Sequence, residues 1–273
     1  MADLASWMSN SNVPWAAYRG LMMCREVALD KMPGVRPIGI GDVFRRLLAK
    51  CVLLETVNEA SGACSSTQLC AGLPLGCEGA VHGMSALFDE HSSETEQFGF
   101  LLIDAANAFN NFSRIQLLWN VRHLWPSGAW FAFNCYKHQS LLVCRDPNDL
   151  SHYSLYSKGG VTQGDPFAMV MFAVGTVPLI DELKTRCPDM IQHCWYADDA
   201  SVLANWSVLL DYYSHLETIG PRFGYFPNES KTVLVVPERL LERASMFFLA
   251  ESFNQPINLW DVSLVTTMEG MFY

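Results

Sequence analysis

The sequence has little basic charge, no closely spaced cysteine pair and no long apolar run, and each absence excludes a class of protein. Lys and Arg number 18 against 28 Asp and Glu, for a net charge of −10. This balance argues against strong non-specific binding of nucleic acid, but it allows a polymerase, whose metal site needs acids. The nine cysteines are scattered without a Cys-x-x-Cys pair, so we expect neither a disulfide framework nor a zinc site.

Sequence signals for a membrane or for secretion are lacking as well. The start, Met1–Leu4, does not show the basic and then apolar pattern of a signal peptide. The longest apolar run, residues 166–180, is too short for a membrane span. We therefore expect a soluble, intracellular protein of the nucleus or cytoplasm. At 50% hydrophobic residues, the 273-residue chain can bury the core of one large domain or two small ones.

Two adjacent carboxylates interrupt an apolar stretch at residues 192–204. Asp198 and Asp199 stand between Cys194-Trp-Tyr196 and Val202-Leu-Ala204, a pattern that predicts two short buried strands joined by a tight turn. Like charges beside an apolar hairpin repel each other and are costly to desolvate, and a divalent metal would offset them best. The alternative is a solvated Asp-Asp turn, since Asp is a common turn residue.

A third carboxylate follows another predicted strand. Residues 98–103 are largely apolar and predict a central strand, with Asp104 at its C-terminal end, where α/β sheets place functional groups. A helix is expected to begin around residues 110–113. An Asp after a strand is commonly only a helix cap, so a functional reading of Asp104 depends on its pairing with Asp198.

Residues 31–50 combine an extended segment with basic side chains. A turn at Pro33-Gly34 precedes an extended stretch at 35–40, and Asp42 is a suitable N-cap for the following helix. Lys31 and Arg36 flank the extended stretch and could bind a triphosphate or template phosphates. A solvated basic face is the alternative.

A glycine-rich turn at residues 159–166 leads into an apolar segment. Asp165 is placed as N-cap and Pro166 as the first residue of a buried helix, which Pro178 is expected to kink or end. The glycines allow close approach of the backbone to a ligand, and Gln163 is the polar group presented there. Downstream we expect a helix at 209–219, a loop at 220–228 and a strand at 230–236.

Four blocks now stand in a fixed order: Asp104-x4-Phe109, Gly160-Val-Thr-Gln-Gly-Asp-Pro166, Tyr196-Ala-Asp-Asp199, and 220–232 with Lys231. This order resembles the palm of reverse transcriptases, particularly those of non-LTR retroelements and group II introns. Val35-Arg-Pro-Ile-Gly-Ile40 and its basic helix resemble the fingers block of the same family, and Gln68-x-x-Ala-Gly72 matches more loosely. The resemblance spans residues 31–237 and leaves 1–30 without an assigned role.

The resemblance implies an α+β fold, namely a right-hand polymerase palm (an antiparallel sheet with helices on one face) with partial fingers and no thumb. It implies an RNA-directed DNA polymerase core of a retroelement, truncated, which joins dNTPs to a primer 3′-hydroxyl by two-metal catalysis. Its partners would be an RNA template, a DNA primer and dNTPs, with no membrane. A partner chain could supply the thumb.

Particular residues receive roles from the same resemblance. Asp104 and Asp198 would ligate two Mg²⁺ ions, with Mn²⁺ as a possible substitute, and Asp199 would complete the carboxylate cluster. Lys231 could protonate departing pyrophosphate, although a structural surface lysine is an equal alternative. Phe109 would lie beside the sugar and select deoxynucleotides. The nucleotide-binding set is Lys31, Arg36, Phe109, Gln163 and Gly164, and the template and primer set is Gln68, Arg46 and Tyr196.

The last segment, residues 238–273, differs in character from the rest. Met246-Phe247 recurs as Met271-Phe272, a period typical of repeat arrays, and the segment resembles the BspA-like, leucine-rich-repeat-related surface repeats. Roughly one unit is present, whereas a stable array needs about three. We therefore expect a junction of two unrelated genes or an element truncated by insertion. Two alternatives to an active enzyme stay open: a non-catalytic remnant that at most binds RNA, and an interaction protein acting through the C-terminal repeat.

Overall fold

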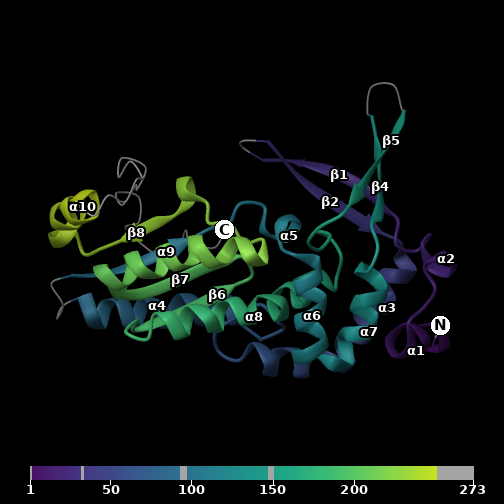
Figure 1. Ribbon diagram of the computed structural model, residues 1–273, viewed down its shortest axis with the longest axis horizontal. Helices are drawn as coiled ribbons and strands as arrows, with labels where there is room; N and C mark the ends of the chain where they lie inside the picture. Colours follow the sequence, from purple (N-terminus) through teal and green to yellow (C-terminus); the bar gives the residue numbers. More distant parts are fainter. Residues whose placement is uncertain (1, 32–33, 93–96, 147–150, 251–273) are drawn as a thin grey trace. The chain divides into compact units, whose positions relative to one another are not determined.

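The computed structural model describes residues 2–31, 34–92, 97–146 and 151–250 (Figure 1). The chain divides into two compact units, and each unit combines two stretches of sequence. Unit 1 is Met1–Ser65 with Asn107–Val177, and unit 2 is Ser66–Ala106 with Pro178–Tyr273. The predicted boundaries at residues 30 and 237 rest on sequence resemblance and stay predictions.

Unit 2 is built on a four-stranded sheet in the order β6-β7-β3-β8. Every pairing in it is antiparallel, and the predicted central strand is β3, between β7 and β8. Its apolar residues alternate between the two faces, as the period of a strand requires. The strands are β3 (Phe98–Ile103), β6 (Gln192–Tyr196), β7 (Asp199–Asn205) and β8 (Val233–Val235).

Helices cover both faces of this sheet. From α4 (Gly76–Ser92), Met84 packs into a buried cluster with Phe98 and Phe100. On the opposite face, the Tyr212 hydroxyl of α9 (Trp206–Phe223) accepts a hydrogen bond of 3.2 Å from the Trp195 indole of β6. The α+β class and the antiparallel palm sheet are therefore confirmed, with the difference that helices lie on two faces instead of one. The last described helix, α10, is Leu241–Ala250.

Unit 1 contains a second sheet, of order β2-β1-β4-β5, in which β1 and β4 are parallel and the other pairs antiparallel. Asp42 caps α3 as predicted, because its carboxylate accepts a 2.8 Å hydrogen bond from the Phe44 backbone N–H. The strands are β1 (Cys24–Asp30), β2 (Val35–Gly41), β4 (Ser140–Arg145) and β5 (His152–Ser157). The helices are α1 (Ala2–Asn10), α2 (Trp15–Tyr18), α3 (Val43–Cys64), α5 (Ala108–Asn111), α6 (Arg114–Leu124) and α7 (Pro126–Tyr136).

The helix after the glycine-rich turn begins later than predicted and does not end at Pro178, whereas the alternative of a kink at Pro178 stays a prediction. It is α8 (Ala168–Arg186), so it begins two residues beyond Pro166 and continues through Pro178. Proline removes one backbone N–H, but the residues beyond it, Leu179, Ile180 and Leu183, are completely buried. Their packing outweighs the lost hydrogen bond, since tertiary contacts supply most of the stability of a helix in a protein.

Two smaller predictions near the C-terminal strand were also wrong in extent. Helix α9 reaches Phe223, so the loop expected at 220–228 is shorter, and Gly224 ends the helix in the left-handed conformation that glycine favours (φ 79°). The strand expected at 230–236 is a 3₁₀ turn at Glu229–Lys231 followed by β8. No helix in the described ranges is both long and apolar enough to cross a bilayer.

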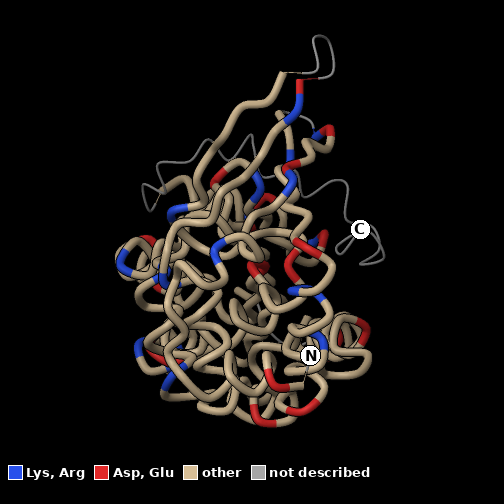
Figure 2. The backbone as a smooth tube through the Cα atoms, turned by 90° about the vertical axis from the view of Figure 1, so that its right-hand side faces the viewer, with Lys and Arg blue, Asp and Glu red and all other residues tan. Residues whose placement is uncertain are grey.

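Charged residues are sparse along the backbone (Figure 2), at 17% of the sequence. Four ion pairs occur within the described residues, and only Arg45–Asp165 has both side chains fully buried. A second pair, Lys231–Asp104, involves two of the predicted site residues. These two pairs are therefore the charge interactions that matter for a candidate site.

Candidate active site

The two adjacent aspartates lie at a tight turn between β6 and β7, as predicted. Tyr196 pairs with Asp199 at the end of the ladder, and Ala197 occupies the left-handed region (φ 55°). Positive φ is uncommon for a residue other than glycine. Ala197 is buried, Asp198 is half-buried and Asp199 reaches solvent. The turn therefore presents two carboxylates at one end of an otherwise apolar hairpin.

A glutamine far away in the sequence holds this turn. The Gln68 side chain donates from Nε2 to the Ala197 carbonyl and accepts from the Ala197 N–H at Oε1, both at 3.0 Å. Its neighbours Thr67 and Leu69 pair with Trp195 of β6 through backbone hydrogen bonds of 2.7 and 2.8 Å. Gln68 is 1% exposed. Sequence reasoning placed it near template or primer, which stays a prediction, and it missed the contact with Ala197.

Asp104 follows β3, and the strand register brings it to the same end of the sheet. Ile103 pairs with Ala200 of β7, so the next residue, Asp104, lies beside the start of the strand that carries Asp199. Lys231 Nζ lies 2.5 Å from Asp104 Oδ2, and the Asp104 carbonyl accepts from the Asn228 N–H at 2.7 Å. The predicted association of Asp104, Lys231 and the Asp-Asp turn therefore has a geometric basis within unit 2.

The three carboxylates share one electrostatic field. The pKa of Asp199 is raised to about 7, first because its surroundings are poorly solvated and then because Asp198 and Asp104 repel its charge. The Lys231 ammonium acts in the opposite direction. Asp199 reaches solvent, but protein around the carboxylate still disfavours the charged form. One lysine against three carboxylates leaves a local excess of negative charge.

Carboxylate oxygens are the donors that Mg²⁺ prefers, so this donor set fits the predicted metals in chemistry and in charge. In the described part of the chain, however, no group of three or more His, Cys, Asp and Glu side chains is arranged as a metal site. Asp104 is paired with Lys231 instead. His82 lies exposed on α4.

In unit 1, the loop that carries Gln163 and Gly164 packs against β2. The Gly39 N–H donates to the Gln163 carbonyl at 2.8 Å, and Gly164 has a positive φ of 100°, where an added Cβ would lie 2.8 Å from the Gly39 carbonyl oxygen. The side-chain oxygen of Gln163 is buried and has no hydrogen-bond partner. Gln163, Gly39 and Thr162 line a cavity of about 650 Å³. This amide oxygen is therefore an unsatisfied acceptor in a residue that lines the cavity.

A buried network that sequence reasoning missed supports this loop. The Asp165 carboxylate accepts from the Arg45 guanidinium, from the Tyr136 hydroxyl and, at 3.1 Å, from the Phe167 N–H. Burial, the largest single influence, lowers the pKa of Arg45, but Asp165 together with the smaller contributions of Cys135, Tyr136 and Cys24 raises that pKa above its usual value. Arg114 also lies close to Tyr136, 5.5 Å from its ring centre. In the sequence, the only hint of this network is that Arg45 lies next to Arg46, which was predicted to contact template or primer.

The remaining predicted residues lie as follows, each described within its own unit. Phe109 is half-buried and stacks on Phe172 in unit 1, with ring centres 4.5 Å apart. Lys31 follows β1 and Arg36 lies in β2, both at the turn end of the β1–β2 hairpin, and Arg36 is exposed. Arg46 is half-buried on α3, and its Nε has no partner. In unit 2, burial is the main cause that raises the pKa of Tyr196, which is half-buried.

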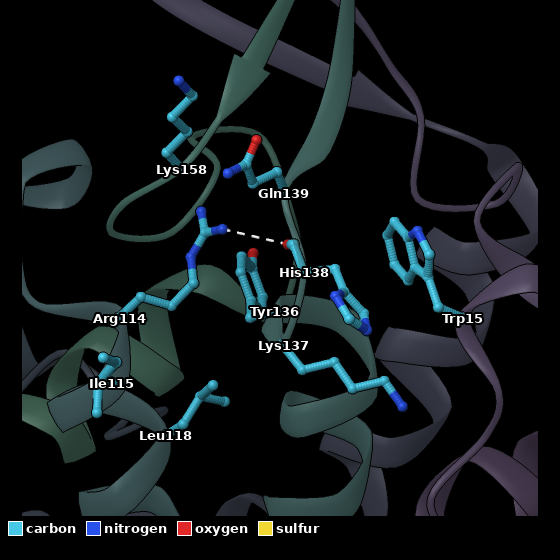
Figure 3. Close-up of a pocket in the computed structure, with 9 residues that line it drawn as sticks. All are labelled: Trp15, Arg114, Ile115, Leu118, Tyr136, Lys137, His138, Gln139 and Lys158. Atoms are coloured by element: carbon cyan, nitrogen blue, oxygen red, sulfur yellow. Dashed lines mark hydrogen bonds between the residues drawn. The ribbon is translucent and has the colours of Figure 1, made fainter.

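A separate cavity of about 520 Å³ lies in unit 1 (Figure 3) and contains no predicted site residue. Arg114 lines this cavity and donates hydrogen bonds to the backbone carbonyls of Ser157, Gly159 and Gly160. Figure 3 shows its bond to the His138 carbonyl, at 3.3 Å. The donors of Arg114 are thus used to fix the loop that leads to Gln163, so this arginine has a structural role.

Two family models match the chain. A model of the reverse transcriptase family (RNA-dependent DNA polymerase) matches residues 30–250. A model of a Mycoplasma protein family of unknown function, DUF285, matches residues 238–273, the segment for which a separate repeat was expected. Within that segment, residues 251–273, including Trp260, lie outside the described residues. No curated protein sequence matches the chain.

Solved structures similar to this chain include telomerases from Candida species. Apo telomerase from Candida tropicalis gives a TM-score of 0.62 at 10% identity over 84% of this chain and 46% of its own. A form truncated from the C-terminal domain gives 0.60 at 10% identity over 80% and 51%. Telomerase from Candida albicans with a fragment of telomeric RNA gives 0.59 at 11% identity over 87% and 46%.

The chain thus spans about half the length of these telomerases, and at such identities the likeness shows the fold alone, which is the right-hand polymerase fold. The reverse transcriptase match covers both units and includes the Asp-Asp turn, the strand-ending Asp104 and the Gln163 loop. On this ground the chain belongs to the reverse transcriptase family.

Proposed function

We propose that this chain is the core of an RNA-directed DNA polymerase from a retroelement, adding deoxynucleotides to the 3′-hydroxyl of a DNA primer on an RNA template inside the cell. The observation that carries the proposal is the shared field of Asp104, Asp198 and Asp199. The sheet register gathers three carboxylates with a single lysine for compensation. Such an arrangement is costly for a purely structural site, because like charges disfavour one another.

The three carboxylates would hold two Mg²⁺ ions, or Mn²⁺ in their place. When bound, these ions neutralise triphosphate charge and make the primer hydroxyl a better nucleophile. Lys231 would act as the proton donor to departing pyrophosphate. Its ammonium is half-exposed and already lies 2.5 Å from Asp104, so a small movement of the side chain would free it for that role.

The nucleotide would be recognised by residues of unit 1. The Phe109 ring, held by its stacking on Phe172, would lie against the sugar and exclude a 2′-hydroxyl. The unpaired amide oxygen of Gln163 and the open backbone at Gly164 would contact the incoming nucleotide. Lys31 and Arg36 would bind its triphosphate. Template and primer would contact Arg46 and Tyr196, whereas Gln68, which is 1% exposed, would contribute by holding the Ala197 turn, and a partner chain could supply a thumb.

Two other functions each rest on one observation. The Lys231–Asp104 ion pair, in which the lysine occupies a predicted metal ligand, favours a non-catalytic remnant that at most binds RNA. The second family match, at residues 238–273, favours an interaction protein that acts through its C-terminal repeat. Neither explains why three carboxylates converge, so we rank both below the polymerase.

A primer-extension assay on RNA and DNA templates separates these functions. The purified chain is incubated with a DNA primer annealed to an RNA or a DNA template, with dNTPs and Mg²⁺, Mn²⁺ or EDTA. The proposal expects extension that requires a divalent ion and proceeds on RNA. If the protein binds the primer annealed to RNA but does not extend it with any metal, the result would instead support the non-catalytic remnant. Absence of both binding and extension would leave the interaction protein.

A further inference from the structure

The turn that carries Asp198 and Asp199 has an unfavourable backbone, which must be held from outside. Ala197 has a φ of 55°, a conformation that costs free energy for an alanine and persists only where the surroundings enforce it. Its peptide groups are also buried, and a buried N–H or C=O without a partner is costly. The hairpin ladder ends at Tyr196 and Asp199, so it cannot satisfy these groups.

Gln68 satisfies both polar groups of Ala197 with one side chain. Its uncharged amide donates and accepts in parallel, as a backbone peptide does. The adjacent backbone hydrogen bonds of Thr67 and Leu69 with Trp195 fix where this amide lies. Because Gln68 is completely enclosed, it has no solvent-exposed alternative position.

Tyr225 provides a second anchor one residue further along. Its hydroxyl donates to the Asp198 carbonyl at 2.8 Å, and its ring lies 5.2 Å from the Trp195 ring. Tyr225 is itself completely buried. Gln68 and Tyr225 thus fix three polar groups of the turn, namely the N–H and C=O of Ala197 and the C=O of Asp198.

We propose that Gln68 and Tyr225 are positioning residues that hold the Asp198–Asp199 turn in the geometry needed to bind divalent ions. The inference rests on the proposed function, since it assigns these residues a part in the same site. Groups that orient ligands in this way commonly change metal affinity or activity by 10–100-fold when mutated. Gln68 therefore acts through Ala197 and need not touch template, primer or nucleotide.

Gln68→Met tests the amide, because methionine has similar length and no donor. Gln192→Met is the matched control, since Gln192 is exposed on β6, the strand with which Thr67 and Leu69 pair. We expect the Mg²⁺ concentration for half-maximal extension to rise about tenfold or more in Gln68→Met, with the KM for dNTP nearly unchanged. Tyr225→Phe, which removes a single oxygen, should shift the Mg²⁺ requirement in the same direction and serves if Gln68→Met does not fold.

Hydrogen exchange at the Ala197 amide tests the same contact without using activity. We expect strong protection in the wild type and at least about tenfold lower protection in Gln68→Met. In Gln68→Glu, only the protonated carboxyl can both donate and accept, so the protection factor should rise as the pH is lowered. If the wild-type protein is inactive but these exchange changes are observed, the polymerase proposal is refuted, whereas the role of Gln68 in holding the turn is retained. Unchanged Ala197 protection, or an unchanged Mg²⁺ requirement in an active Gln68→Met, would overturn the inference.

Discussion

Replacing Asp165 by asparagine should strongly destabilise the protein, because it leaves a buried cation without its counter-ion. The Asp165 side chain is completely buried and Arg45 is 4% exposed. Asparagine retains an oxygen that can accept from Phe167 or Tyr136, so the main change is the loss of negative charge beside the guanidinium. Breaking a buried ion pair on one side typically costs about 3–5 kcal/mol, a large part of the roughly 5–15 kcal/mol that stabilises a domain.

The cost arises from the unpaired charge, and a second substitution can therefore relieve it. In the double variant Arg45→Met with Asp165→Asn, no buried charge remains, and apolar replacement of a buried pair is often neutral. We expect the double variant to be more stable than Asp165→Asn alone. Asp211→Asn, on the exposed surface of α9, is the control and should change stability by less than about 0.5 kcal/mol.

Urea unfolding followed by circular dichroism measures these differences, with the slope checked for each variant. The reasoning requires two results together: a loss of several kcal/mol in Asp165→Asn and partial recovery in the double variant. A loss below about 1 kcal/mol, or a double variant that is less stable than Asp165→Asn, would show that the pair is not the main support of the Gln163 loop.

Three further predictions concern single residues. Burial, and then Lys184, lower the pKa of His193 to about 4, so the unfolded state, with a histidine pKa near 6.5, binds the proton first as the pH falls. The free energy of unfolding should therefore decrease by up to about 3 kcal/mol as the pH drops from 7 to 4. Denaturant unfolding at several pH values should show a smaller decrease in His193→Phe. Gly160→Ala should destabilise by more than about 1 kcal/mol, since φ is 51° and the new Cβ would lie 1.9 Å from the Phe109 carbonyl oxygen; an unchanged melting temperature would contradict this. Phe109→Ala should raise the kcat/KM ratio for ribonucleotides over deoxyribonucleotides, and an unchanged ratio in an active variant would remove Phe109 from the site.

The sequence was informative where local pattern decides structure. The apolar run at 98–103 and the interrupted run at 192–204 predicted β3 and the β6–β7 hairpin, because burial on both faces leaves few alternatives for such segments. Asp42 was recognisable as a cap because the bond it makes spans two residues. The three carboxylates followed from the ends of these strands and from the resemblance to a known family.

The contacts that support the site could not be predicted in this way. Gln68 and Ala197 are 129 residues apart, and Arg45 and Asp165 are 120 apart, so neither pair has a local signature. The continuation of α8 through Pro178 likewise depends on packing around Leu179 and Ile180, which overrides the usual effect of proline. Only the tertiary structure decides these cases.

The most direct test of the central claim compares Asp198→Asn with wild type and with Asp211→Asn in Mg²⁺-dependent primer extension on an RNA template. Asp198 lies in the carboxylate cluster, whereas Asp211 is a solvated helix residue, so the two variants remove the same charge at different places. The account predicts extension by the wild type and by Asp211→Asn, and none by Asp198→Asn, while all three melt at nearly the same temperature. Extension by Asp198→Asn at a near wild-type rate would contradict it.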